Sequence, residues 1–222
     1  MGGGQVRGCG VRPRLLDLFS GGGGAAMGYH RAGFDIVGVD NRPQPHYPFE
    51  FHCADALTFP LDGFDAVHGS PPCQDHSSLG PTTKRTHGTG WMLAATRKRL
   101  LAQDAPWVIE NVPGAPMRPD YRLCGCMFGL PGLRRERWFE TSWHGFDLRP
   151  PCHHAGRAVT VAGHGAQGGW EYINGVAPSQ ADRRAAMGID WLNRTELAQA
   201  IPPAFAEYVG RSLLEQIRER AA

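Results

Sequence analysis

The feature that most constrains the fold is a glycine-rich turn between a short apolar run and a helical segment near the start of the chain. Residues 14–19 form the apolar run, residues 20–24 (Ser-Gly-Gly-Gly-Gly) form the turn, and residues 25–32 have helix-compatible composition with Gly33 placed as a C-cap. Residues 36–40 (Ile-Val-Gly-Val-Asp) are a second buried run that ends in an acid. This order predicts a β-turn-α-β unit of an α/β sheet.

The turn and the acid together favour a nucleoside cofactor. Glycines in such a turn let the backbone approach a ligand closely, and an acid about 20 residues further on can bind ribose hydroxyls. Asp40 has that spacing. The turn alone is a weak signal, because 30 of the 222 residues are glycine. A third run, residues 51–56, carries Asp55, which suits either an adenine amino group or a turn or helix cap.

A second feature is a cysteine held by a Pro-Pro pair directly after a buried run. Residues 64–68 read as a short strand, and residues 69–74 (Gly-Ser-Pro-Pro-Cys-Gln) follow it. Proline fixes φ and removes a backbone donor, so this loop is stiff and cannot continue the sheet. A thiol needs only a modest lowering of its pKa of about 8.5 to become a strong nucleophile. Cys73 is therefore a candidate nucleophile, and a buried structural cysteine is the alternative.

The later segments continue the α/β order. Residues 75–90 are polar and too long for an ordinary connector, which indicates a functional loop. Residues 92–101 have an amphipathic helical pattern with apolar positions at 92, 93, 100 and 101. Residues 107–109 predict a fourth buried strand that Glu110 closes. A carboxylate there faces the ligand side of a parallel sheet and can act as an acid, with a solvated glutamate as the alternative.

The C-terminal part is less regular. Arg135 and Arg137 alternate with other side chains, so they are expected to share a face of one strand. Residues 141–180 show little periodicity, whereas residues 181–187 and 204–220 predict helices, the second of them amphipathic.

Composition bounds the class of protein. The chain is 41% hydrophobic and 20% charged, which suits one domain with a sizeable core and a small appendage. No apolar window of about 18 residues exists, so no membrane partner is expected, and residues 1–12 are expected to be a flexible leader. The net charge of +2 gives no global field toward nucleic acid. Six irregularly spaced cysteines without a secretion signal favour reduced thiols in a cytosol.

Several potential metal ligands lie in the irregular part, namely Cys124, Cys126, Cys152, His153 and His154. The Cys-x-Cys spacing departs from the Cys-x-x-Cys of ordinary zinc sites. A plain loop with buried thiols is therefore favoured over a structural zinc, and no metal is expected.

The order of these parts resembles the cytosine-C5 DNA methyltransferase family. The matching pieces are residues 17–24 (Asp-Leu-Phe-Ser-Gly-Gly-Gly-Gly), Val39-Asp40, Asp55, residues 70–74 (Ser-Pro-Pro-Cys-Gln), 110–112 (Glu-Asn-Val), 135–137 (Arg-Glu-Arg) and 199–203 (Gln-Ala-Ile-Pro-Pro). The Pro-Pro-Cys-Gln run with a later Glu-Asn-Val is a specific pair. The compact length resembles phage or prophage members of the family.

The resemblance implies a Rossmann-like S-adenosylmethionine-dependent methyltransferase fold, with a mostly parallel sheet, helices on both faces and a small loop-rich target-recognition appendage. It implies a catalytic and cofactor-binding domain at 13–140, a reduced target-recognition segment at 141–180 and a C-terminal part at 181–222 that returns to the catalytic domain. So short a segment predicts a short recognition sequence, weak selectivity or help from a partner subunit. A monomer or weak homodimer in the cytoplasm of a bacterial or phage-infected cell is expected.

The resemblance also implies S-adenosyl-L-methionine as the cofactor. Asp40 would hold its ribose and Asp55 its adenine. Gln199 stands where the family usually has asparagine, so a modified sulfonium donor is an alternative. The residues expected to line the cofactor site are Phe19, Ser20, Gly21, Gly23, Asp40, Asn41, Asp55, Ala56, Pro72 and Gln199.

In the chemistry that the resemblance implies, Cys73 attacks cytosine C6 while Glu110 hydrogen-bonds N3 and the amino group. Arg137 would hold the carbonyl O2, with Arg135 supporting it. The target carbon is buried in duplex DNA, so the base must be flipped out. The expected contacts to double-stranded DNA are Gln74, Ser77, Lys84 and Arg85.

These residues predict a DNA (cytosine-5-)-methyltransferase. A tRNA cytosine-C5 methyltransferase would use the same residues, and a DNA cytosine-C5 alkyltransferase would use a modified donor. A catalytically silent nucleic-acid-binding protein is a further alternative, although it has no need of both Cys73 and Glu110. A dehydrogenase built on the same β-turn-α unit is disfavoured, because no residue suited to handling a hydride is evident.

Overall fold

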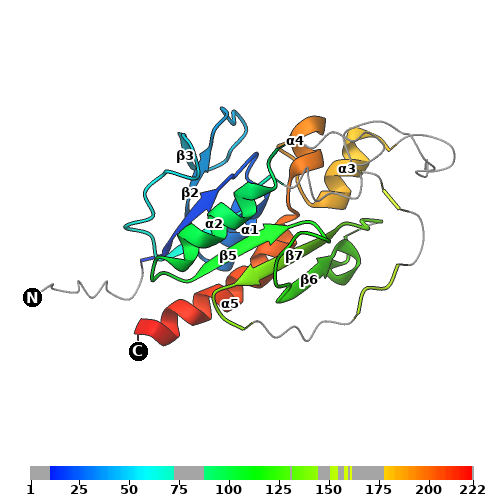
Figure 1. Ribbon diagram of the computed structural model, residues 1–222. Coiled ribbons are helices and arrows are strands. Elements are labelled where there is room, and N and C mark those ends of the chain that lie inside the picture. Colours follow the sequence, from blue (N-terminus) through cyan, green and yellow to red (C-terminus); the bar gives the residue numbers. More distant parts are fainter. Residues whose placement is uncertain are drawn as a thin grey trace, which may run out of the picture.

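A single mostly parallel sheet organises the part of the chain that the computed structural model describes (Figure 1). The described residues are 11–72, 88–130, 132–144, 151–154, 158–159, 161 and 178–221. The strands are β1 (Arg14–Leu18), β2 (Asp35–Asp40), β3 (Glu50–Cys53), β4 (Ala66–Gly69), β5 (Trp107–Asn111), β6 (Tyr121–Cys124) and β7 (Glu136–Thr141). Their order in the sheet is β3-β2-β1-β4-β5-β7-β6. β1 to β5 pair in parallel, whereas β7 runs antiparallel to both β5 and β6.

Helices cover both faces of this sheet, as the sequence predicted. The helical elements are α1 (Gly24–Ala32), α2 (Trp91–Leu101), the 3-10 helix η1 (Gly125–Phe128), α3 (Gln180–Met187), α4 (Arg194–Gln199) and α5 (Pro203–Ala221). Alternation along β1 divides the core, because Leu15 packs in the cluster with α1 and α5 while Leu16 packs in the cluster with α2. Within the described ranges, no helix is both long enough and apolar enough to cross a bilayer.

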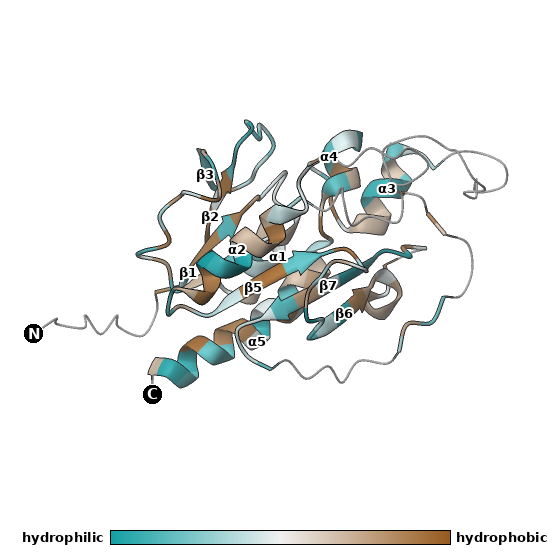
Figure 2. Cartoon of the chain, in the orientation of Figure 1, coloured by the Kyte–Doolittle hydropathy of each residue, from teal (hydrophilic) through white to brown (hydrophobic). Residues whose placement is uncertain are grey.

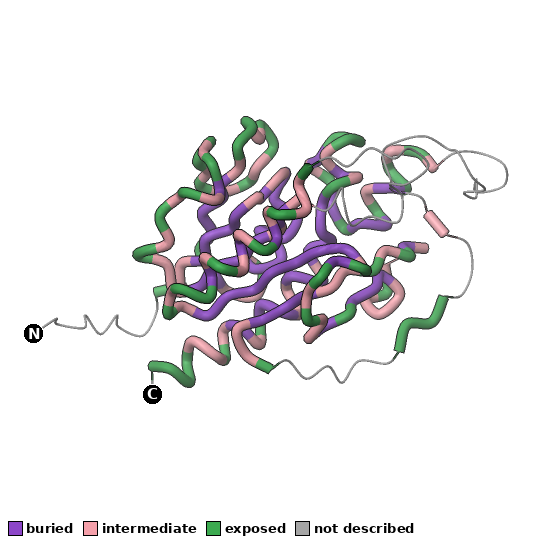
Figure 3. The backbone as a smooth tube through the Cα atoms, in the orientation of Figure 1, coloured by how far each residue is buried: buried purple, intermediate pink, exposed green. Residues whose placement is uncertain are grey.

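The hydropathy and burial patterns agree with this layering. The C-terminal helix α5 alternates between hydrophobic and hydrophilic residues in Figure 2, as expected for a helix with one face on the sheet. In Figure 3 the central strands are buried and the outer loops are exposed. α1 and α5 approach closely at Gly28, where an added Cβ would lie 2.2 Å from the carbonyl oxygen of Pro203. Only glycine allows this helix contact.

Two details differ from the sequence prediction. Leu101 was expected on the apolar face of α2, but it is 66% exposed, and Thr96 is buried with Leu93 and Leu100 instead. Arg135 lies one residue before the start of β7, so Arg137 alone of the two arginines belongs to the strand. Leu101 is exposed because α2 turns through about 100° per residue, so Leu100 and Leu101 cannot both face the sheet.

The C-terminal part returns to the glycine turn. Ser179 and Asn193 cap α3 and α4 through side-chain oxygens, which fixes where these short helices begin. A third apolar cluster, which includes Leu192 and Leu197, packs the two helices together. The indole nitrogen of Trp191 then donates a hydrogen bond of 3.0 Å to the carbonyl oxygen of Gly22. This bond joins segments that are 169 residues apart in the chain.

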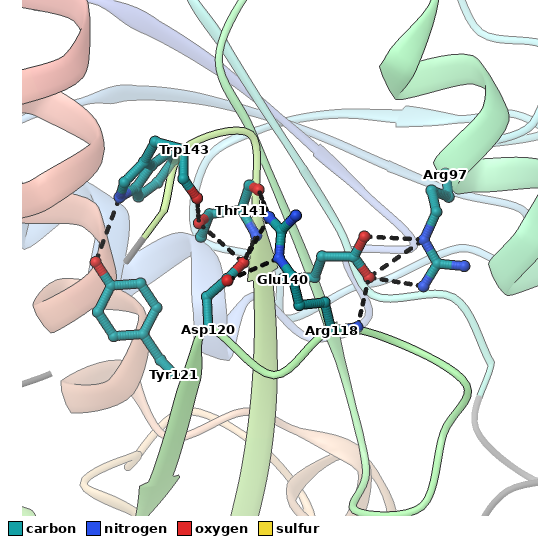
Figure 4. Close-up of polar contacts among 7 residues, drawn as sticks. All are labelled: Arg97, Arg118, Asp120, Tyr121, Glu140, Thr141 and Trp143. Carbon is teal, nitrogen blue, oxygen red and sulfur yellow. Dashed lines mark hydrogen bonds and ion pairs between the residues drawn. The ribbon is translucent and has the colours of Figure 1, made fainter. Parts of the chain in front are cut away.

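A polar network fixes β7 against α2 and against the loop that precedes β6 (Figure 4). Glu140, which is 6% exposed, accepts hydrogen bonds from Arg97 Nε at 3.0 Å and Arg97 Nη2 at 2.6 Å. It also accepts one from the backbone N–H of Arg118 at 3.2 Å. The Arg118 side chain pairs with Asp120, which in turn accepts the backbone N–H of Thr141. The network therefore holds the start of β6 and the end of β7 together, at one end of this antiparallel pair.

Removing the Glu140 carboxylate should destabilise the fold strongly. We expect Glu140→Ala to lower the free energy of unfolding by about 3 kcal/mol, since it leaves the Arg97 guanidinium partly buried without its counter-ion. The exposed i,i+4 pair of Glu207 and Arg211 provides the control, and Glu207→Ala should cost about 0.5 kcal/mol or less. Urea unfolding of both variants measures the difference, and equal losses would contradict a structural role for the network.

Candidate active site and cofactor crevice

The predicted site residues that lie in the described ranges gather at one edge of the sheet. The glycine turn follows β1, Asp40 ends β2, and Asp55 follows β3. Pro72 follows β4, and Glu110 lies in β5 near its end. These five strands are parallel, so their carboxyl ends meet at the same edge, which is where ligands bind in open α/β sheets.

The glycine turn is held open by the acid at the end of β2. Asp40 Oδ2 accepts the backbone N–H of Gly21 at 3.1 Å, and Asp40 Oδ1 accepts that of Arg42 at 3.0 Å. A Cβ added at Gly21 would meet nothing within 4 Å, so the turn faces open space. Phe19 has φ of 58°, the one positive value among non-glycine residues in the described part of the chain. Such backbone strain is typical of ligand-binding turns.

These features fit a bound nucleoside. The Ser20 hydroxyl is buried and makes no hydrogen bond to the described residues, so it is an unsatisfied polar atom beside the open face of Gly21. The Asp40 carboxylate retains lone pairs after its two backbone bonds, because each carboxylate oxygen can accept more than one hydrogen bond. The crevice therefore offers a close backbone approach together with polar groups for a ribose.

The other predicted cofactor residues are placed less uniformly. Gly23 does not face the open crevice, because a Cβ there would lie 2.8 Å from Pro48 Cδ. Asp55 is exposed, and its Oδ1 accepts the backbone N–H of Leu57 at 2.9 Å. It therefore caps a turn, which was the alternative to adenine binding in the sequence analysis. Ala56 is buried in the core, and its carbonyl oxygen accepts from Arg99.

The remaining predicted residues lie at the ends of three different elements. Asn41 is exposed after β2, and Pro72 is half-buried after β4. Gln199 is exposed at the end of α4, and the next residue, Ala200, packs against Gly24 at the start of α1. The segment that carries Gln199 thus borders the glycine turn.

Glu110 is a buried carboxyl group in contact with Arg137. The residue is 5% exposed, and Arg137 Nε lies 2.9 Å from Glu110 Oε1 as an ion pair without hydrogen-bond alignment. Burial raises the pKa of Glu110, and the charges of Arg137, His68 and Arg135 lower it by less. Desolvation therefore outweighs the ion pair, and the carboxyl group is biased toward its protonated form. A protonated carboxyl group can donate to a ring nitrogen.

The two arginines take different positions. Arg137 lies on β7 against Glu110, while Arg135 Nη2 donates to the carbonyl oxygen of Ala198 at 2.7 Å. Arg135 is still close enough to lower the pKa of Glu110. The structure thus brings both predicted arginines to the carboxyl group, one directly and one from the side of α4.

The Pro-Pro loop is bonded to the end of β5. Asn111 Nδ2 donates to the carbonyl oxygen of Pro71 at 3.0 Å, and Asn111 Oδ1 accepts the N–H of Val112 at 2.9 Å. Asn111 is 1% exposed, so the bond is sheltered from water. It places the start of the loop beside Glu110. The predicted nucleophile Cys73 lies outside the described residues, as do Gln74, Ser77, Lys84 and Arg85.

Sequence reasoning missed a buried polar cluster under the site. His68 Nδ1 lies 2.7 Å from Asp17 Oδ1, and the Tyr47 hydroxyl donates to Asp17 Oδ2 at 3.3 Å. Asp17 and His68 are both fully buried and are register partners on β1 and β4. Burial, followed by the charge of Asp17, raises the pKa of Tyr47. The available signal was a polar residue inside each of two apolar runs.

The sequence is similar to that of known DNA methyltransferases. Residues 13–122 match the sequence model of the family described as C-5 cytosine-specific DNA methylase. The type II methyltransferase M.HgiDI of Herpetosiphon aurantiacus is 34% identical over an alignment of 136 residues, and the match covers 54% of this chain and 43% of that protein. M.HgiGI, a type II methyltransferase of the same organism, is 35% identical over an alignment of 119 residues, and the match covers 46% of this chain and 92% of that protein.

Solved structures share the fold. A triple mutant of Spodoptera frugiperda DNMT2 aligns with a TM-score of 0.60 at 12% identity, covering 91% of this chain and 99% of that one. The Entamoeba histolytica methyltransferase EhMeth gives 0.60 at 11% identity, covering 93% and 99%.

The sheet order is that of the Rossmann-like methyltransferase class of folds, which the solved structures above share. M.HgiGI is 35% identical and is matched over 92% of its length, and residues 13–122 match the family model. These two matches identify the family within that class. The chain belongs to the C-5 cytosine-specific DNA methylase family. It covers less than half the length of M.HgiDI.

Proposed function

We propose that this protein transfers a methyl group from S-adenosyl-L-methionine to C5 of a flipped-out cytosine in double-stranded DNA. The observation that carries the proposal is the Glu110 carboxyl group. Burial biases it toward protonation, Arg137 contacts it, and Asn111 bonds the loop that leads to Cys73 beside it. An acid beside a thiol is the pairing that this reaction needs.

The glycine turn and the strand-end acids would hold the cofactor. Gly21 offers its open face, Asp40 its carboxylate to the ribose, and the exposed Asp55 its carboxylate to the adenine. When bound, S-adenosyl-L-methionine supplies an electrophilic methyl group. Gln199 borders the start of α1, and its amide would contact the donor from that side.

The chain's own residues would carry the proton and electron-pair transfers. The Cys73 thiolate forms a bond to C6 while Glu110 gives a hydrogen bond or proton to N3, which makes C5 nucleophilic. Arg137 orients the base through O2. After C5 has gained the methyl group, its proton passes to a water molecule and the electron pair restores the C5–C6 double bond. Cys73 then leaves C6 as a thiolate, and N3 returns its proton to the Glu110 carboxylate.

Labelled cofactor and duplex DNA test the proposal. Purified protein should form labelled 5-methylcytosine in the duplex, and Cys73→Ser should abolish it because serine is not ionised at neutral pH. Cys53→Ser, at an exposed free cysteine on β3, is the matched control and should retain activity. Bisulfite sequencing then gives the sequence context.

A substrate panel distinguishes the alternatives. Duplex DNA, single strands and tRNA are compared, and nucleoside mass spectrometry identifies the transferred group. Activity on tRNA alone, an adduct heavier than methyl, or no product at all would each contradict the proposal. Phage or prophage origin, cytoplasmic location and a monomer or weak homodimer stay predictions.

A further inference from the structure

A compact group of sulfur and nitrogen side chains lies at the β6 edge of the sheet, and none of its members belongs to the site described above. It consists of Cys124 at the end of β6, Cys126 in η1, and Cys152 and His154 from the segment beyond β7. The three sulfur atoms and the imidazole nitrogen all lie within 4.8 Å of one another. The sequence prediction of a plain loop was based on the Cys-x-Cys spacing. Spacing along the chain does not show that Cys152 and His154 lie beside Cys124 and Cys126 in space.

The separations fit a ligand shell around one ion. Cys152 Sγ lies 2.9 Å from His154 Nε2, Cys124 Sγ lies 3.2 Å from the same nitrogen, and the sulfurs of Cys126 and Cys152 are 3.2 Å apart. Tetrahedral bonds of about 2.3 Å to sulfur and about 2.0 Å to nitrogen place ligand atoms roughly 3.5–3.8 Å apart. A shift of a few tenths of an ångström in each side chain therefore accommodates an ion.

The surroundings orient these ligands. Cys124 is the N-cap of η1, and its sulfur accepts the backbone N–H of Met127. Amide donors toward thiolate sulfur are the kind of outer interaction that supports metal ligands. Cys124 itself is buried, whereas Cys126 is half-buried and Cys152 is exposed, so an ion has a path of entry.

We propose that Cys124, Cys126, Cys152 and His154 bind one Zn²⁺ ion. Three thiolates and an imidazole are the soft, tetrahedral donor set that zinc prefers, and hard cations such as Mg²⁺ do not select it. Four protein ligands close the coordination sphere, which makes the site structural and not catalytic.

The ion would fasten the segment beyond β7 to the edge of the sheet. Cys124 pairs with Glu136 across β6 and β7, and the preceding residue Leu123 pairs with Arg137. The zinc site thus lies one residue along the strands from the arginine that contacts Glu110. A bound metal contributes folding free energy directly, so the ion would stabilise the attachment of residues 152–154 to β6 and η1.

Metal analysis of the full chain tests this inference independently of methyl transfer. Protein expressed in zinc-containing medium and purified under reducing conditions should contain close to one zinc ion per chain, measured by elemental mass spectrometry. Cys126→Ser and Cys152→Ser should each lose most of it. The matched controls are His153→Ala, next to a proposed ligand, and Cys53→Ser, a free cysteine on β3; both should keep the metal.

Cobalt substitution gives a readout that does not depend on the variants folding. Wild-type protein stripped of metal and titrated with Co²⁺ should show the intense visible bands of tetrahedral cobalt and a sulfur-to-cobalt charge-transfer band, saturating near one equivalent. A strong chelator should lower the Tm of the wild type and leave that of Cys152→Ser unchanged. No zinc in the wild type, octahedral cobalt spectra, or a Cys126–Cys152 disulfide in the reduced preparation would each overturn the proposal.

Discussion

Glu110→Gln is expected to slow methyl transfer by about 10²–10⁴-fold, the range for the loss of a general acid. Glutamine keeps the shape of the side chain and can still lie beside Arg137, but it cannot deliver a proton to N3. The loss should therefore appear in kcat, with little change in the KM for S-adenosyl-L-methionine. Single-turnover assays with labelled cofactor measure it, and Glu215→Gln, an exposed carboxyl group on α5, is the matched control.

The same variant should be at least as stable as the wild type at neutral pH. Burial raises the pKa of Glu110, so the folded state binds this proton more tightly than the unfolded chain. The stability from that proton is fully present below the unfolded pKa of about 4.3 and is lost as pH rises through the higher native pKa. Glutamine carries no charge and escapes this loss.

Unfolding at two pH values checks the sign. Glu110→Gln should exceed the wild type in free energy of unfolding at about pH 7, and the two should converge near pH 4. If the variant were instead less stable at neutral pH, the ion pair with Arg137 would outweigh desolvation, and the carboxyl group would be ionised in the free enzyme. Retained methyl transfer would remove Glu110 from the mechanism.

The second large effect is expected at the buried pair under the site. His68→Ala should lower the free energy of unfolding by about 3–5 kcal/mol, because it leaves the Asp17 carboxyl group buried with only the Tyr47 hydroxyl as a partner. A change of this size exceeds the cost of most single substitutions.

A double-mutant cycle separates lost pairing from lost volume. Asp17→Ala, His68→Ala and the double variant are compared by urea unfolding. Since removing both partners leaves no stranded charge, the double variant should be more stable than the sum of the single losses predicts, by about 1–3 kcal/mol. Additive losses would show that the two side chains contribute only their packing. Tyr47→Phe, which removes the weaker 3.3 Å bond, should cost far less.

Local patterning was sufficient for the order of elements. The apolar run, glycine turn, helix and second run at 14–40 agree with β1, α1 and β2 within one residue at most boundaries, and Gly33 is the C-cap. Motif spacing likewise predicted that Asp40 ends a strand and that Glu110 lies at the end of another, and the structure has Asp40 as the last residue of β2 and Glu110 next to the last residue of β5. These signals are local, because backbone preferences and side-chain periodicity depend on near neighbours in the chain. Local signals failed for Leu101, which is the last residue of α2, and for Arg135, which lies just before the start of β7.

Tertiary structure alone decided which side chains meet. Asp17 contacts His68 across 51 residues, Asn111 reaches Pro71 across 40, and Trp191 bonds Gly22 across 169. The Cys and His ligands converge only because β6 and the segment beyond β7 meet at one edge of the sheet. The pKa of Glu110 likewise follows from what buries it and not from its neighbours in sequence. Burial and long-range pairing are properties of the packed sheet, so no local pattern encodes them.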